Sequence, residues 1–350
     1  MSEHWDPAGF KDRIDALLED FLAAEAERLV TIDGALRPVT EQLRVAARHG
    51  KRMRAAFCYW GWRASGQPGC DALLRAAASM ELVHAAATVH DDIIDDSPIR
   101  HGLPTVHVAL ETPLAGGSRP RAGGRSLAML VGDHLMSLAG QLFAESGLPA
   151  AYLSRARPMW ADLARELIAG ECLEILATGA CPDPEVSLKV IRYKTAKYTV
   201  EQPLLIGALL AGASPGLREA LSAYGLPLGE AFQLRDDLLG LFGDPEHTGK
   251  ASLDDIRANR PTALLAMTWQ AALPSQRDHL AAVLGSRDLD DGHLREVREL
   301  MVELEAPQRV EELIAQRVRE AVRHLNGAGV PAQARQALTV LAHHATDRHR

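Results

Sequence analysis

The stretch "LLRAAASMELVHAAATVHDDIIDD", Leu73 to Asp96, decides the fold class of this chain. Up to Val89 it is apolar almost all round, which is typical of a helix buried in the middle of a large helical domain. It then ends in four carboxylates: Asp91, Asp92, Asp95 and Asp96. A buried helix that runs into like charges predicts that its end opens into a cleft, where something positive offsets them.

Helical periodicity also dominates the rest of the chain. Further helical patterns cover roughly 127–146, 151–178, 184–211, 216–241, 262–283 and 310–326, and no stretch alternates convincingly with the period of a strand. These patterns predict an all-α fold, a large single-domain bundle over residues 1–350 with a central cavity. The Gly-, Pro- and Arg-rich stretch 111–126 is predicted to be a mobile surface loop.

Composition narrows the function classes. The chain has 350 residues, 47% of them hydrophobic and 24% charged, with a net charge of −8. This acidic balance argues against a nucleic-acid binder, which would present a basic face. The four cysteines have no C-x-x-C spacing, and neither a signal peptide nor an apolar run long enough to cross a bilayer is visible. We therefore expect a cytoplasmic protein without a transmembrane segment.

The carboxylates have a spacing that favours metal binding. On a helix, Asp91 and Asp95 share one face, as do Asp92 and Asp96. A second acidic pair, at 236–237, ends another apolar helix. Mg²⁺ prefers a few carboxylates, water and phosphate oxygens. Two such clusters across a cavity could therefore hold several ions around one diphosphate.

Two simpler interpretations of the acidic run stay open. It could be the solvated end of a helix, or His90–Asp91 could belong to a metal phosphohydrolase of the HD type, which would need further histidine ligands. An EF-hand is excluded, because the stretch lacks that loop's ligand and glycine spacing.

A diphosphate site also needs cations, and the chain offers them at four places. The simplest interpretation of any one of them alone is a surface lysine or arginine whose aliphatic stem packs on apolar neighbours. Two acidic clusters together with four basic stations, however, indicate a diphosphate site. The basic residues are Lys51 and Arg54, Arg100, Lys194 and Lys197, and Lys250 and Arg260.

In these ordered motifs the chain resembles the trans-isoprenyl (polyprenyl) diphosphate synthases, most closely the bacterial geranylgeranyl diphosphate synthases. The motifs lie in the family's order between about residues 50 and 262. They are "GKRMR" (50–54), "ELVHAAATVHDDIIDD" (81–96), "IRHGLPTVH" (99–107), "LVGDHL" (130–135), "GECLEI" (170–175), "YKTA" (193–196) and "FQLRDDLLGLFGD" (232–244).

The resemblance implies a reaction and its residues. Mg²⁺, three ions with substrate bound, would draw pyrophosphate from an allylic diphosphate, farnesyl or shorter, and isopentenyl diphosphate would attack the resulting cation. A homodimer is also implied. The roles implied by the resemblance are metal binding for Asp91, Asp95 and Asp236; isopentenyl diphosphate binding for Lys51, Arg54 and His84; allylic diphosphate binding for Arg100, Lys194 and Lys250; and a place near the cation for Thr195 and Gln233.

Several positions depart from the family's pattern. His101 stands where a second arginine is usual, so a bidentate phosphate contact is lost. Gly240 replaces the last aspartate of the second acidic motif, and Glu171 and Glu174 replace a glutamine and an aspartate. Arg260 replaces a lysine and keeps its charge as a substrate-binding residue.

The resemblance also places a ruler for product length on the helix that ends at Asp91. One-turn steps down that face reach Ala86, Val83 and Met80. Val83 and Met80 lie about 12 Å and about 16 Å below Asp91 at 1.5 Å per residue. A floor at either level suits a twenty-carbon product, geranylgeranyl diphosphate, although other helices, with Leu135 and Met136, could also set it.

Two rival functions remain. A class I terpene cyclase would ionise the same substrates but would not need an isopentenyl-binding set such as Lys51, Arg54 and His84. A non-catalytic partner subunit of a prenyl synthase should have lost acidic ligands, which this chain retains.

Overall fold

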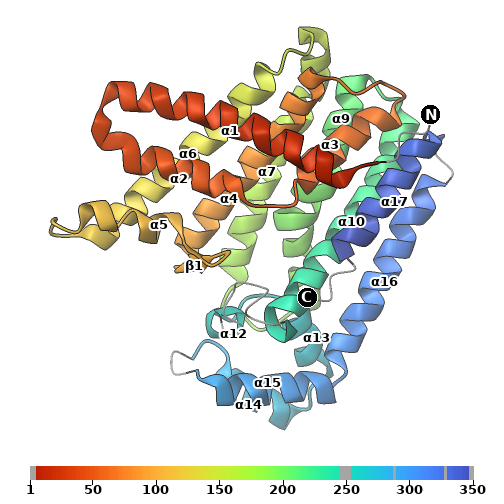
Figure 1. Cartoon of the computed structure of the whole chain (residues 1–350). Helices are drawn as coiled ribbons and strands as arrows, with labels where there is room; N and C mark the ends of the chain where they lie inside the picture. Colours follow the sequence, from red (N-terminus) through yellow and green to blue (C-terminus); the bar gives the residue numbers. More distant parts are fainter. Residues whose placement is uncertain (1–4, 244–253, 287–288, 327–328, 347–350) are drawn as a thin grey trace.

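The structure, a computed structural model, describes residues 5–243, 254–286, 289–326 and 329–346. These ranges are helical almost throughout, which confirms the all-α prediction (Figure 1). The helices are α1 (Pro7–Ile32), α2 (Arg37–Arg48), α3 (Met53–Ala64), α4 (Asp71–Ile94), α5 (Val106–Ala109), α6 (Pro120–Ala144), α7 (Ala150–Ala177), α8 (Pro184–Val190), α9 (Gln202–Ala211), α10 (Pro215–Phe242), α12 (Asp254–Ala258), α13 (Ala263–Ala271), α14 (Pro274–Val283), α15 (Asp291–Glu303), α16 (Ala306–Leu325) and α17 (Ala332–Thr346).

The described ranges also contain 3₁₀ turns, one π-helix and one pair of strands. The 3₁₀ turns are η1 (Gly34–Leu36) and η2 (Thr112–Leu114), and the π-helix η3 (Ile191–Glu201) joins α8 to α9. Strands β1 (Ile99–Arg100) and β2 (Leu103–Pro104) form an antiparallel hairpin, the only sheet in the described ranges.

Helix α4 lies inside the bundle, as its sequence predicts. It packs against α6, α3, α2 and α1, and every residue from Ala76 to Val83 is buried. Small alanine side chains let these neighbours approach closely. The buried Glu81 carboxylate accepts a hydrogen bond from the Ala55 amide at 2.8 Å, which fixes the start of α3 beside α4. The acidic end of α4 is thereby held at a defined place in the molecule.

Two apolar cores meet along α10. The larger core gathers α1, α3, α4, α6, α7 and α9, and includes Tyr224 and Leu228 of α10. The smaller core is formed by α13 to α16 together with Leu234 and Leu238 of the same helix. Helix α10, which carries the second acidic pair, therefore contributes to both cores.

The π-helix is wider than an α-helix, and its neighbours face it with glycines. A Cβ atom on Gly170 of α7 would lie 2.2 Å from the Lys194 amide nitrogen, and one on Gly229 of α10 would lie 2.5 Å from Ala196 Cα. These close approaches hold η3 between α7 and α10. Such π-type turns occur frequently at functional sites.

Substituting one of these glycines tests how closely η3 must be held. We expect Gly170→Ala to lower the free energy of unfolding by about 1–3 kcal/mol, because the added methyl group overpacks a backbone contact. Activity should fall with it, since Lys194 moves. Urea unfolding followed by circular dichroism measures the change.

Gly216→Ala is the matched control for this substitution. Nothing lies within 4 Å of a Cβ atom at Gly216, near the start of α10, so its stability should be unchanged or slightly higher. Equal stability for the two variants would show that the close approach at Gly170 is not needed.

The prediction of a mobile loop over 111–126 is wrong in its second half. Helix α6 begins at Pro120, and η2 lies within the first half. Gly124 serves packing rather than chain flexibility, because a Cβ atom there would lie 2.5 Å from the His107 carbonyl oxygen of α5. A glycine-rich stretch can therefore be a helix wherever another backbone crosses it closely.

Helices α4 and α6 are the two described helices that are long and apolar enough to cross a membrane by length and composition. In α4, 72% of the apolar window is buried inside the molecule, as expected of a core helix. In α6 the share is 44%, and Met129 and Leu130 are exposed. The exposed face of α6 thus carries Met129 and Leu130 among the polar residues Ser126, Asp133 and Ser137, and no other described part of the chain covers it.

Candidate active site

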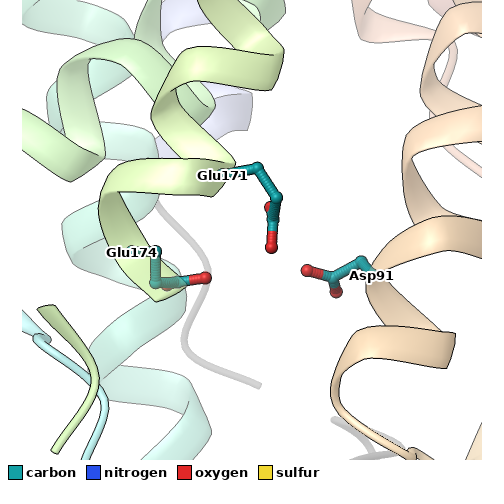
Figure 2. Close-up of side chains that lie close together, drawn as sticks. All are labelled: Asp91, Glu171 and Glu174. Atoms are coloured by element: carbon teal, nitrogen blue, oxygen red, sulfur yellow. The ribbon is translucent and has the colours of Figure 1, made fainter. Parts of the chain in front are cut away.

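Three carboxylates converge between α4 and α7. Oxygen atoms of Asp91, Glu171 and Glu174 all lie within 4.8 Å of one another (Figure 2). Glu171 and Glu174 stand three residues apart, so they share one face of α7 opposite the end of α4. Burial raises the pKa of Glu171, and the neighbouring Lys194 opposes that rise. Among the described residues this is the one group of three with metal-ligand spacing.

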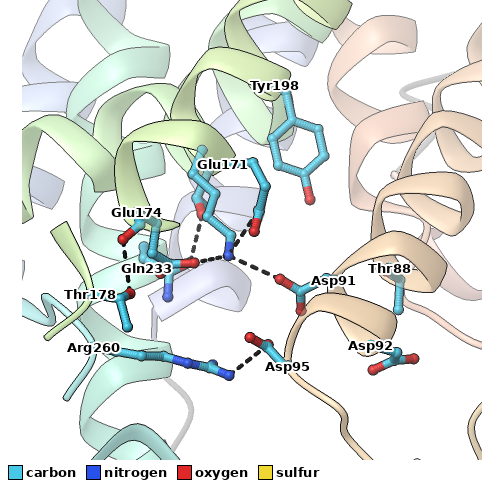
Figure 3. Close-up of polar contacts among 12 residues, drawn as sticks. Thr88, Asp91, Asp92, Asp95, Glu171, Glu174, Thr178, Tyr198, Gln233 and Arg260 are labelled. Carbon is cyan, nitrogen blue, oxygen red and sulfur yellow. Dashed lines mark hydrogen bonds and ion pairs between the residues drawn. The ribbon is translucent and has the colours of Figure 1, made fainter. Parts of the chain in front are cut away.

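Lys194 places its ammonium group among these carboxylates. Its Nζ atom lies 2.9 Å from Asp91 Oδ1, 3.0 Å from Glu171 Oε2 and in contact with Glu174 (Figure 3). The pKa of Lys194 is raised: burial lowers it, but the charges of Asp91, Glu174 and Glu171 outweigh that effect. The side chain is therefore a permanent cation.

Asp95 lies one turn beyond Asp91 and faces the same space (Figure 3). Burial raises its pKa to about 6, and the charge of Asp91 adds to the effect. Arg260 opposes it, with NH2 2.6 Å from Asp95 Oδ2. The prediction that Asp91 and Asp95 point together is confirmed, and Arg260 belongs to the site.

Asp92 and Asp96 do not act together, contrary to the helical spacing. Asp92 is buried and holds Arg100, with 2.8 Å from Nε to Oδ1 and 2.7 Å from NH2 to Oδ1. Asp96 lies beyond the end of α4 with a φ of 54° and pairs with Arg121 and Arg125 of α6. The helix ends before Asp96, so the four-residue spacing no longer applies.

Arg100 also reaches the carboxylate cluster. Its NH2 atom lies 3.3 Å from Asp91 Oδ2. Burial lowers the pKa of Arg100, but the hydrogen bond and charge of Asp92 outweigh that and raise it. Arg100 is thus a fixed cation beside the carboxylates, as a diphosphate site requires.

Thr195 and Gln233, both predicted to lie near the cation, contact each other. The Thr195 hydroxyl donates to Gln233 Oε1 at 2.7 Å, and Gln233 Nε2 donates to Asp237 Oδ1 at 2.8 Å. Because the hydroxyl proton is taken by Gln233, the remaining lone pairs of the Thr195 oxygen are available to a positive charge. Asp236 follows Gln233 by three residues, so both lie on neighbouring positions of one face of α10.

A second group of basic side chains, called the basic pocket below, lies at His84, about two turns before Asp91 on the same face of α4. Arg54 is buried; its NH2 atom donates to the Tyr198 hydroxyl at 2.7 Å and to Thr199 Oγ1 at 2.9 Å. The buried Arg54 Nε atom has no hydrogen-bond partner in the described part of the chain. His84 Nδ1 lies 3.3 Å from the same Tyr198 hydroxyl. The structure thus brings Arg54 and His84 together through a tyrosine.

The three basic residues of "KRMR" have different environments. Lys51 is exposed. Arg52 has a φ of 55° and points inward, where it donates to the carbonyl oxygens of Ala47, Arg48 and His49 at the end of α2. Arg52 is therefore structural, and Lys51 and Arg54 remain the candidates for substrate binding.

His101 occupies the tip of the β1–β2 hairpin. Its φ is 52° and that of Gly102 is 75°, as a two-residue turn of this kind requires. Histidine is among the residues that tolerate this conformation. Its ring lies 5.6 Å from that of His49, so the position that departs from the family's pattern lies beside the segment that carries Lys51.

The proposed chain-length residues all face the protein interior. Ala86, Val83 and Met80 are buried on α4, as is Leu135 of α6. Side chains at these positions therefore line the interior beside α4. Lys250, predicted to bind the allylic diphosphate, lies outside the described residues.

The donor set fits a divalent cation. Glu171 Oε1 is buried without a hydrogen-bond partner in the described ranges, while Asp91 and Glu174 both contact Lys194 and Asp91 also contacts Arg100. Oxygen ligands of this kind suit Mg²⁺. Asp91, Glu171 and Glu174 would hold it, with Asp95 and Asp236 as the further ligands implied by the motifs.

Comparison with known proteins decides the family. A model of the polyprenyl synthetase family matches residues 38–301. The chain belongs to the polyprenyl synthetase family. It is a trans-prenyltransferase, and several of the motifs that indicated this family contribute residues to the site just described.

Individual relatives differ in product. A (2E,6E)-farnesyl diphosphate synthase of Mycobacterium tuberculosis is 34% identical over 312 residues, which cover 85% of this chain and 80% of the relative. A geranylfarnesyl diphosphate synthase of Aeropyrum pernix is 30% identical, covering 79% of this chain and 81% of the relative. The chain is thus similar to enzymes named for different product lengths.

A solved structure matches nearly the whole fold. It is the crystal structure of a geranylgeranyl pyrophosphate synthase from Corynebacterium glutamicum complexed with isoprenyl diphosphate and magnesium. It is 35% identical, covers 98% of this chain and 100% of its own, and has a TM-score of 0.93.

Sequence reasoning missed part of the site. Glu171 and Glu174 were noted only as departures, and Tyr198 had no role. The signal for the glutamates was present, since "GECLEI" places two acids on one helix face after a glycine. Nothing in the sequence shows that a π-helix turns Tyr198 toward α3 and α4.

Proposed function

We propose that this prenyltransferase condenses isopentenyl diphosphate with an allylic diphosphate, farnesyl or shorter, to give geranylgeranyl diphosphate. The observation that carries the proposal is the pair of charged stations about two turns apart along the face of α4 that η3 contacts. One has carboxylates around Lys194, with Arg100 and Arg260. The other is a carboxylate-poor pocket with Arg54 and His84.

The carboxylate station would ionise the allylic substrate. Lys194 and Arg100 would donate to its diphosphate, and Asp91, Glu171 and Glu174 would hold Mg²⁺. When bound, Mg²⁺ supplies positive charge that makes the diphosphate a better leaving group. The allylic C–O bond breaks, and the Thr195 oxygen faces the developing cation.

The basic pocket would hold the nucleophile. Arg54 has an unpartnered buried Nε–H, and His84 is available from the same side. Isopentenyl diphosphate bound there would present its double bond to the cation, a new C–C bond would form, and the released pyrophosphate would take the proton. A terpene cyclase would have no use for this pocket.

Product analysis tests both the reaction and the chain length. With Mg²⁺, farnesyl diphosphate and isopentenyl diphosphate, we expect mass spectrometry to find a C20 diphosphate. Ala86→Phe should shift the product toward C15, because an aromatic ring would close the face of α4 about 8 Å below Asp91 at 1.5 Å per residue. An unchanged length in this variant would show that α4 is not the ruler.

We further propose a homodimer through α6. The support is an apolar helix of which only 44% of the window is buried, with Met129 and Leu130 exposed. A second copy would cover this face. Sedimentation equilibrium should give twice the 37.9 kDa chain mass, and a monomer at micromolar concentration would overturn the proposal.

A further inference from the structure

The hydroxyl of Tyr198 lies between two groups of the basic pocket. Tyr198 is buried on η3, one turn beyond Lys194 and Thr195, and its ring lies below the Arg54 guanidinium, 4.5 Å from ring centroid to Cζ. Arg54 NH2 is 2.7 Å from the hydroxyl, and His84 Nδ1 is 3.3 Å from it on the other side. Figure 3 shows the hydroxyl pointing into the space beside α4.

The proton inventory of these three groups has one consistent solution. Arginine has no acceptor atom, so Arg54 donates and the Tyr198 oxygen accepts. The proton of the phenol then needs an acceptor, and His84 Nδ1 is the one within reach. Placing a proton on Nδ1 instead would leave the phenol proton without a partner inside a buried pocket.

A second hydroxyl lies near the same ring nitrogen. Thr88, one turn along α4 from His84, has its Oγ1 atom 3.5 Å from the same Nδ1. His84 Nε2 has no hydrogen-bond partner among the described residues. Both hydroxyls therefore gather at one ring nitrogen, and the other nitrogen is left for a ligand.

Electrostatics keep this imidazole neutral. Burial lowers the pKa of His84 well below its ordinary value, and the charges of Arg54, Arg100, Arg52 and His101 lower it further. Those cations come from α3, from the hairpin and from the turn before α3. A ring that stays neutral has only one N–H group, so its position decides what the residue can bind.

We propose that Tyr198 is a positioning residue that fixes His84 as its Nε2–H tautomer, so that His84 binds the isopentenyl diphosphate as a neutral donor. This inference rests on the proposed function, because the ligand is taken from it. The hydrogen bond from Tyr198 to His84 also couples the two stations, because Tyr198 and Lys194 lie on the same π-helix. The position of Lys194 among the carboxylates thus constrains the position of Tyr198, and through it the His84 donor.

Isosteric substitutions of His84 provide the first test. Glutamine places an amide N–H near the position of Nε2, whereas asparagine places one near Nδ1. We expect His84→Gln to raise the KM for isopentenyl diphosphate by less than about threefold, and His84→Asn by roughly thirtyfold or more, at an unchanged KM for the allylic substrate. A better-tolerated asparagine would overturn the proposal.

A double-mutant cycle separates the tautomer effect from any other role of Tyr198. Tyr198→Phe should raise the KM for isopentenyl diphosphate roughly tenfold in the wild-type background, but by less than about threefold in the His84→Gln background, which needs no fixed tautomer. Equal factors in the two backgrounds would mean that Tyr198 does not act through His84.

The control is Tyr193→Phe on the same π-helix. The Tyr193 hydroxyl makes no hydrogen bond in the described part of the chain, so this variant should keep both KM values. Raised KM values in Tyr193→Phe would show that the loss of any phenol hydroxyl from η3 weakens substrate binding.

A spectroscopic measurement keeps the inference independent of the proposed function. In protein with ¹⁵N-labelled histidine rings, the signal missing from His84→Gln identifies His84. Its Nδ1 should show the shift of an unprotonated nitrogen, and Tyr198→Phe should move it toward an average of both tautomers. A protonated Nδ1 in the wild type would overturn the tautomer assignment. If product formation does not depend on isopentenyl diphosphate, the proposed function fails while the tautomer stands.

Discussion

Replacing Asp91 with asparagine should lower kcat about a thousandfold, which corresponds to about 4 kcal/mol of transition-state stabilisation. Among the described residues, Asp91 is the one carboxylate that contacts both Lys194 and Arg100 and also faces Glu171 and Glu174. Its loss removes a metal ligand and releases two cations from their positions. Steady-state kinetics with saturating Mg²⁺ and both substrates measures the effect.

Asp96→Asn is the control, since it removes the same charge from the same acidic run. Asp96 points away from the site and pairs with Arg121 and Arg125 on the surface. Such pairs contribute about 0–1 kcal/mol to stability, so kcat should stay within about twofold of the wild type. If both variants lose activity equally, the run acts as a diffuse acidic patch and not through Asp91.

Replacing Lys194 with glutamine should change activity and metal affinity in opposite directions. The ammonium group contacts Asp91, Glu171 and Glu174 and thus competes with a cation for them. Without it, Mg²⁺ should bind the substrate-free protein about tenfold more tightly, while kcat falls about a hundredfold because the allylic diphosphate loses a donor. Isothermal titration calorimetry and steady-state kinetics measure the two effects.

The matched variant is Lys197→Gln. Lys197 lies on the same π-helix but pairs with Glu166, 3.0 Å from Nζ to Oε1, and contacts none of the three converging carboxylates. Neither Mg²⁺ affinity nor kcat should change in this variant. Weaker Mg²⁺ binding in Lys194→Gln than in the wild type would mean that Lys194 organises the carboxylates rather than competing for them.

The helical content was predictable because long amphipathic and apolar periods are local signals. The residue at which α4 ends was harder to predict. The sequence shows four aspartates at helical spacing, but the chain leaves the helix before Asp96. Only the partners Arg121 and Arg125, in a stretch predicted to be a loop, explain where Asp96 points.

The site shows the same division between local and tertiary information. Asp91, Lys194 and Gln233 could be named from motifs, since each lies within a recognisable pattern. Their shared geometry depends on Gly170 and Gly229, which let the π-helix lie close to α7 and α10. These contacts join segments that are far apart in the sequence, so no local periodicity predicts them.

The central claim is that two stations, about two turns apart along the face of α4 that η3 contacts, handle two diphosphates. The most direct test incubates the protein with Mg²⁺ and farnesyl diphosphate, with and without isopentenyl diphosphate, and identifies every product. A longer prenyl diphosphate should form only when isopentenyl diphosphate is present, with no hydrocarbon in either reaction. A hydrocarbon formed from farnesyl diphosphate alone would contradict the account and indicate a terpene cyclase.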